Sequence, residues 1–215
     1  KLVWKPAPEK SLRPDVLSPV AEPFAPDGGL RVLDGNLGRG VIKVSAVAPE
    51  HRKIEAPAVV FNDQNELKAA FESGDLDRDC IVIVRFQGPR SNGMPELHKL
   101  TPYLGVLQDR GFKVGLVTDG RMSGASGKVP SAIHLCPECA DGSILTKVRD
   151  GDMIRLDTQR GELNVLVDEE ELNSRMACVL ANTEHHYGMG RELFDSFRQG
   201  VSSAETGAIN MFNVE

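Results

Sequence analysis

Cysteine, aromatic residues and long hydrophobic runs are all scarce in this chain of 215 residues. Its four cysteines are too few to hold a fold together by disulfides, so we expect a reducing compartment, the cytoplasm. No apolar run approaches the roughly 20 residues that span a bilayer. The sequence also lacks the charged segment followed by an apolar core that is typical of a signal peptide. We therefore expect neither a membrane protein nor a secreted disulfide scaffold.

Positive charge is also in deficit, because 25 Lys and Arg face 31 Asp and Glu, which gives a net charge of −6. A general nucleic-acid binder needs a basic face, so we expect no nucleic-acid partner. An anionic small molecule remains compatible with this balance, since it needs only a local group of Arg and Lys side chains.

Proline is concentrated at the start of the chain, where residues 1–29 contain six of the 13 prolines. Because proline lacks an amide donor and disfavours helix, this stretch is typical of an extended arm or linker. The chain begins at Lys1, and we expect it to be a piece of a longer polypeptide. One folded domain is expected over residues 30–215.

The remainder predicts a mixed, strand-rich α/β domain. Continuous β-branched runs at residues 80–86 and 113–117 are typical of strands buried on both faces. Leucines at helical spacing predict a helix over residues 96–110. Other expected strands are residues 30–33, 41–47, 58–61, 146–148, 152–156 and 163–167, and other expected helices are 66–72, 169–175 and 191–198.

A glycine-rich segment, residues 118–128, follows the second buried strand and reads TDGRMSGASGK. Its backbone N–H groups could hold an anion. It is not a Walker A loop, because Met122 and Val129 occupy the places of that motif's Gly and Ser or Thr. The spacing around Ser123 also departs from a nucleophile elbow. A substrate loop and a plain tight turn both stay open on spacing alone.

A second loop, residues 87–96, follows the other buried strand, so both loops leave the carboxyl ends of strands, where α/β sheets bind ligands. Glu96 either complements a helix dipole or serves as a hard oxygen ligand for a cation such as Mg²⁺. His134, Cys136 and Cys139 form only part of a metal-ligand set. We therefore interpret the two cysteines as small apolar residues and the histidine as structural.

Two long segments carry a family resemblance. Residues 85–100 (RFQGPRSNGMPELHKL) and 117–134 (VTDGRMSGASGKVPSAIH) resemble signature segments of the dihydroxy-acid dehydratase/6-phosphogluconate dehydratase family. Within these segments, the sequences NGMPELHK and SGASGKVP are similar to those of the family's 6-phosphogluconate branch. The resemblance covers residues 30–212 and corresponds only to the C-terminal portion of such an enzyme.

The resemblance implies a swivelling β/β/α domain with a β-barrel-like core and flanking helices. It also implies removal of water from 6-phosphogluconate to give 2-dehydro-3-deoxy-6-phosphogluconate, in the Entner–Doudoroff pathway. The iron–sulfur cluster of that reaction would take its ligands from an N-terminal portion outside this chain. The isolated domain is then expected to be inactive, and the whole enzyme to be a homodimer.

The same resemblance assigns roles to residues. It implies that Ser123 is the catalytic base, acting as an alkoxide, and that Glu96 contributes to a divalent-cation site, for Mg²⁺ or another metal. The expected substrate-binding residues are Arg121, Lys128, Arg90 and Asp119, of which Asp119 also orders the loop. A dehydratase of another sugar acid or of a dihydroxy acid, and a non-catalytic anion-binding domain, remain as alternatives.

Overall fold

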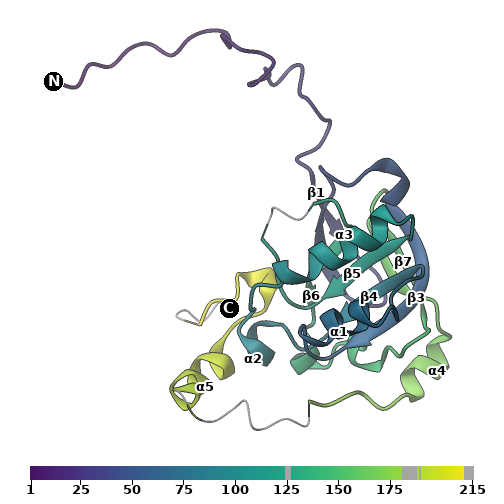
Figure 1. The fold of residues 1–215 in the computed structure, drawn as a ribbon. Helices are drawn as coiled ribbons and strands as arrows, with labels where there is room; N and C mark the ends of the chain where they lie inside the picture. Colours follow the sequence, from purple (N-terminus) through teal and green to yellow (C-terminus); the bar gives the residue numbers. More distant parts are fainter. Residues whose placement is uncertain (124–126, 181–187, 189, 211–215) are drawn as a thin grey trace.

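The computed structural model describes residues 1–123, 127–180, 188 and 190–210 (Figure 1). The strands are β1 (Leu30–Leu33), β2 (Arg39–Lys43), β3 (Lys53–Phe61), β4 (Cys80–Val84), β5 (Val114–Thr118), β6 (Ser131–Cys136), β7 (Met153–Asp157) and β8 (Glu162–Val165). The α-helices are α1 (Glu66–Glu72), α2 (Pro89–Asn92), α3 (Thr101–Asp109), α4 (Glu169–Ser174) and α5 (Arg191–Gly200). Short 3-10 helices are η1 (Pro49–His51), η2 (His98–Leu100), η3 (Cys139–Asp141), η4 (Ile144–Lys147) and η6 (Ala204–Thr206). None of the helices so described is long and apolar enough to cross a membrane.

The eight strands form one sheet in the order β1-β2-β6-β5-β4-β3-β7-β8. The four central strands, β6, β5, β4 and β3, are parallel, and the outer pairs join them antiparallel. The two edges meet where Asp34, after β1, forms a bridge with Glu162 of β8. The sheet is therefore nearly closed, and the predicted strand-rich α/β fold with a barrel-like core and flanking helices is confirmed (Figure 1).

The core has two parts because the central strands are buried on both faces. In β4, Ile81 and Ile83 belong to the cluster inside the barrel. The alternate residues Cys80, Val82 and Val84 belong to a second cluster that includes the buried leucines of α1 and α3. This is the burial expected for a continuous β-branched run in a parallel sheet.

β3 changes partners along its length. Its first half, up to Pro57, pairs antiparallel with β7, and its second half, from Ala58, pairs parallel with β4. Proline cannot donate to a strand ladder, so it suits the changeover between the two pairings. The predicted strand over residues 58–61 is thus the second half of a longer one.

Two sequence predictions about elements were wrong, and one strand, β6, was not predicted. The expected strand over residues 146–148 falls on η4, whose first turn is capped by Ser143. The expected helix over residues 96–110 begins only at Thr101, because Pro102 lies in the first turn of α3, where proline is favoured. The preceding leucine-bearing turn is η2.

Residues 1–29 contain no helix or strand, and they run away from the folded body (Figure 1). Their apolar side chains are exposed: Trp4 is 86% exposed and Phe24 is 70% exposed. These features agree with an extended arm. Its boundary as a separate unit stays a prediction.

Candidate functional site

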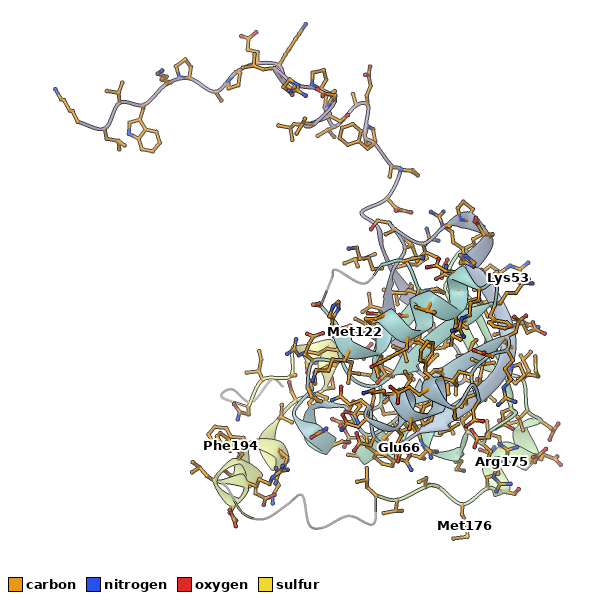
Figure 2. The ribbon with its side chains drawn as sticks, viewed as in Figure 1. Lys53, Glu66, Met122, Arg175, Met176 and Phe194 are labelled. Atoms are coloured by element: carbon orange, nitrogen blue, oxygen red, sulfur yellow. The ribbon has the colours of Figure 1, made fainter. Side chains whose placement is uncertain are left out.

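The two loops that the sequence singled out lie side by side at the carboxyl ends of β4 and β5. The two strands are parallel neighbours, with Val84 paired to Thr118. Beyond them, Glu96 and Arg121 form a bridge between the loops, and the Leu97 N–H donates to the Arg121 carbonyl at 3.3 Å. Met122, the next residue, is labelled in Figure 2. The fold therefore brings the two predicted site segments together.

The Glu96 carboxylate is the centre of this junction. Its Oε1 accepts hydrogen bonds from the Ser123 N–H at 2.9 Å and from the His98 N–H at 3.1 Å. Its Oε2 forms an ion pair with Arg121 Nη1 at 3.0 Å. Arg121 Nε also donates to the Met94 carbonyl at 2.7 Å. Ser123, Glu96 and Arg121 are thus in direct contact, while their chemical roles stay predictions.

Three non-glycine residues near this junction have left-handed backbone conformations, which are costly for L side chains. Phe86 (φ 60°) follows β4, Met94 (φ 52°) supplies the carbonyl that Arg121 contacts, and His134 (φ 57°) lies in β6. The His134 N–H donates to the Gly120 carbonyl at 2.8 Å, just before Arg121. Such strain gathers at functional sites more often than elsewhere, so it marks these loops as constrained.

Asp119 is fully buried behind the junction. Its Oδ1 accepts the Gln87 N–H and its Oδ2 accepts the Cys139 N–H, each at 2.9 Å. Burial raises the pKa of this carboxyl. The side chain therefore ties three segments together, which supports its expected ordering role. A contact between Asp119 and substrate stays a prediction.

Arg90 and Lys128 each pair with an acidic residue other than Glu96. Arg90 Nη1 pairs with Asp141 at 2.7 Å, and its guanidinium also donates to the Val201 carbonyl. Lys128 pairs with Asp109, the last residue of α3, which lies at the edge where β5 begins. Residues 124–126 of the glycine-rich segment lie outside the described residues, and the expected substrate contacts of Arg90 and Lys128 stay predictions.

Glu138 is a structural member of the site that the sequence did not indicate. Its buried carboxylate accepts the Arg90 N–H at 2.9 Å and the Ser91 N–H and Oγ, both at 3.0 Å. It therefore caps the amino end of α2. Burial raises the pKa of this carboxyl. A single glutamate far from α2 along the chain gives no sequence signal for such a cap.

The resemblance implies two metal groups, an iron–sulfur cluster and a divalent cation, and the described residues of this chain fit only the second. Within the described ranges, no three His, Cys, Asp or Glu side chains gather into a metal-ligand group. Cys136 and Cys139 are buried free thiols, and burial raises the pKa of both. These residues do not make a cluster site. Glu96 fits a divalent cation as one ligand, because Oε2 keeps one lone-pair position beside Arg121.

Comparison with known proteins gives a family and close relatives. Residues 15–208 match the family model "Dihydroxy-acid/6-phosphogluconate dehydratase C-terminal". The chain is 60% identical over 208 residues to a phosphogluconate dehydratase of Pseudomonas aeruginosa and 58% identical over 208 residues to that of Escherichia coli K12. Each match covers 97% of this chain and 34% of the relative. A dihydroxy-acid dehydratase of Pyrococcus furiosus is 40% identical over 205 residues, which cover 92% of this chain and 35% of the relative. The chain spans about a third of the length of these relatives.

Proposed function

Because the chain belongs to the dihydroxy-acid/6-phosphogluconate dehydratase family, as its C-terminal part, we propose that it is the C-terminal domain of a phosphogluconate dehydratase. The proposed enzyme removes water from 6-phosphogluconate and gives 2-dehydro-3-deoxy-6-phosphogluconate. The observation that carries the proposal is the junction of Ser123, Glu96 and Arg121, formed by the two segments that bear the family motifs. Its choice of substrate is supported by the 60% identity to a relative of that name.

In the proposed reaction, Ser123 takes the proton from C2 of the substrate, hydroxide leaves from C3, and the resulting enol tautomerises to the 2-keto acid. A serine hydroxyl is a weak base, so positive charge or backbone donors must favour its alkoxide. Arg121 lies two residues away and supplies a guanidinium, which Glu96 partly offsets. Lys128, which pairs with Asp109, is a further proposed source of positive charge.

Metal chemistry in the proposed enzyme comes from two places. A divalent cation held in part by Glu96 would supply positive charge near the substrate's oxygens. The described residues form no cluster site, so the proposed iron–sulfur cluster would take its ligands from the rest of the polypeptide.

The proposed partners are a phosphorylated sugar acid, the remaining two thirds of the polypeptide and a second copy in a homodimer. Exposed apolar side chains on α5 support a protein partner, because such patches mark interaction sites. All four cysteines are free thiols, which supports the cytoplasm as the compartment. Arg121, Arg90 and Lys128 are the proposed contacts for anionic groups of the substrate, and Asp119 is a further proposed substrate-binding residue.

The test is dehydration by the full-length polypeptide, prepared without oxygen and scored for 2-keto-3-deoxy products. Ser123→Ala should lower kcat by a factor on the order of 10² or more, the usual contribution of a positioned base. Ser174→Ala, an exposed serine at the end of α4, is the matched control and should keep wild-type activity.

The alternatives give different results in the same assay. Faster turnover of a dihydroxy acid or of another sugar acid than of 6-phosphogluconate would assign the enzyme to a different substrate. If the isolated 215-residue chain binds a phosphorylated ligand and the full-length protein dehydrates none of the substrates, the chain would be an anion-binding domain. Full activity in Ser123→Ala would overturn the assignment of the base.

A further inference from the structure

We propose that Glu96 is a positioning residue, which fixes the backbone at Ser123 through a carboxylate-to-amide hydrogen bond. The inference rests on the proposed role of Ser123 as the base. It adds to Glu96 a function separate from cation binding: Oε1 accepts the two amides, while Oε2 pairs with Arg121 and is the oxygen left for the proposed cation.

The geometry of Oε1 carries this inference. That oxygen is shared by two amides, Ser123 N–H at 2.9 Å and His98 N–H at 3.1 Å. His98 is the first residue of η2, which leads directly into α3, and helix α3 is anchored by buried leucines. The carboxylate therefore links the residue that carries the proposed base to a rigid element of the core.

Ser123 needs such a link because it is exposed and lies outside any helix or strand, within the glycine-rich segment. The same loop is already fixed two and three residues earlier. The Arg121 carbonyl accepts the Leu97 N–H, and Gly120 packs so closely that a Cβ there would lie 2.6 Å from Gln87 Cβ. The Glu96 contact extends this fixed region to Ser123 itself. A base works only when it is held in reach of the proton that it removes.

Stability alone does not explain the arrangement. The side chains of Arg121 and Glu96 are 48% and 38% exposed, and ion pairs at such exposure add little to folding. The Glu96 carboxylate therefore acts chiefly by holding two parts of the site together, because it accepts one amide from the glycine-rich segment and one from the start of η2.

The division between the two oxygens makes the roles separable. In Glu96→Gln, the remaining carbonyl oxygen can still accept from the Ser123 and His98 amides, while the NH₂ group removes the ion pair and any cation ligand. In Glu96→Ala, both functions are lost. A role restricted to metal binding would make the two variants equivalent.

The experiment measures amide hydrogen exchange by NMR in the ¹⁵N-labelled 215-residue chain, without substrate or added metal. Loss of a charge-assisted hydrogen bond should speed exchange at Ser123 and His98 by about fivefold or more in Glu96→Ala. Glu96→Gln should speed exchange at these two amides clearly less than Glu96→Ala does, because a neutral acceptor replaces the charged one but the hydrogen bonds remain. Thermal unfolding midpoints close to wild type would show that both variants fold.

Glu55→Ala is the matched control. Glu55 pairs with Arg155 at 2.9 Å on the β3–β7 ladder, at exposures of 42% and 37%, and should not alter exchange at Ser123. Unchanged exchange at Ser123 in Glu96→Ala, or equally fast exchange in both Glu96 variants, would overturn the proposal. An active Ser123→Ala enzyme with the expected exchange pattern would overturn the proposed base and leave the positioning contact standing.

Discussion

His134 lies in β6 with a left-handed backbone and lines a hollow of about 370 Å³ together with Arg39 and Glu205. Partial burial and, to a smaller extent, the charge of Arg121 lower the pKa of its imidazole from the ordinary 6.5. The folded protein therefore keeps this side chain neutral at a pH where the unfolded chain would protonate it. Arg39 and Glu205 form their own ion pair across the hollow.

The sign of the pH dependence follows from that shift. Above about pH 6.5 both states hold His134 neutral, so the group adds nothing to the pH dependence of stability. Below it the unfolded state binds the proton first, and the free energy of unfolding falls as the pH is lowered. His134→Asn should remove this loss, and asparagine tolerates the left-handed backbone.

Urea unfolding at about pH 7.5 and about pH 5.5 measures the effect, and wild type should lose more stability between them than His134→Asn does. An equal loss in wild type and His134→Asn would show that His134 is not the group responsible.

The residues of the site differ in how far the sequence could predict them. Ser123, Glu96 and Arg121 lie in long motifs, and parallel strands bring the two motifs to one edge. Lys128 is near Ser123 along the chain, yet its side chain pairs with Asp109 at the end of α3, and its expected contact with substrate stays a prediction. Glu138 acts on α2 from a distant segment, and only the folded chain shows that contact.

At the scale of elements, closure of the sheet depends on one close approach between the β1–β2 turn and β8. A Cβ on Gly35 would lie 2.0 Å from the Leu163 carbonyl oxygen. The adjacent Asn36 side chain donates to the Val165 carbonyl and accepts from the Val165 N–H, both at 2.8 Å. Moving the turn away from β8 to make room for a Cβ would break these two hydrogen bonds. Only glycine leaves room for these contacts.

Gly35→Ala should therefore lower the free energy of unfolding by about 2 kcal/mol or more, since the clash is with backbone rather than with a side chain that can turn away. The matched variant is Gly105→Ala in α3, where a Cβ would meet nothing within 4 Å. It should raise stability by about 0.5–1 kcal/mol, because alanine favours helix. Denaturant unfolding measures both changes, and the same change in both variants would contradict the close-approach argument.

The sequence predicted the central strands better than the edges for a physical reason. β4 and β5 are buried on both faces, so they read as unbroken β-branched runs. β6 has two half-buried residues in its middle, and prolines lie on either side of it, so its pattern resembles a loop. The 3-10 helix η4 is similarly short, and its few apolar residues do not distinguish it from a strand.

At the scale of the whole molecule, apolar side chains gather on surfaces away from the core. α5 has no buried residue, and its Leu193, Phe194 and Phe197 are 69%, 56% and 47% exposed. The two phenylalanine rings lie 5.9 Å apart between centroids. The relatives are about three times as long as this chain, so we propose that the rest of the polypeptide covers this face of α5.

This proposal predicts a stability cost that depends on the length of the chain. Phe194→Ser/Phe197→Ser should change the free energy of unfolding of the 215-residue chain by less than about 0.5 kcal/mol per site, as at exposed positions generally. In the full-length polypeptide the same pair should cost about 3 kcal/mol or more, because buried aromatic rings are lost from an interface.

Met176→Ser, at a side chain that is 89% exposed and outside α5, is the matched control. It should cost little in either chain, because a single exposed methionine needs no covering partner. Thermal or denaturant unfolding of the two lengths, side by side, measures the difference. Equal costs of the phenylalanine pair in the short and the long chain would mean that α5 stays exposed in the whole protein, and its apolar face would then have to meet a second copy or another protein instead.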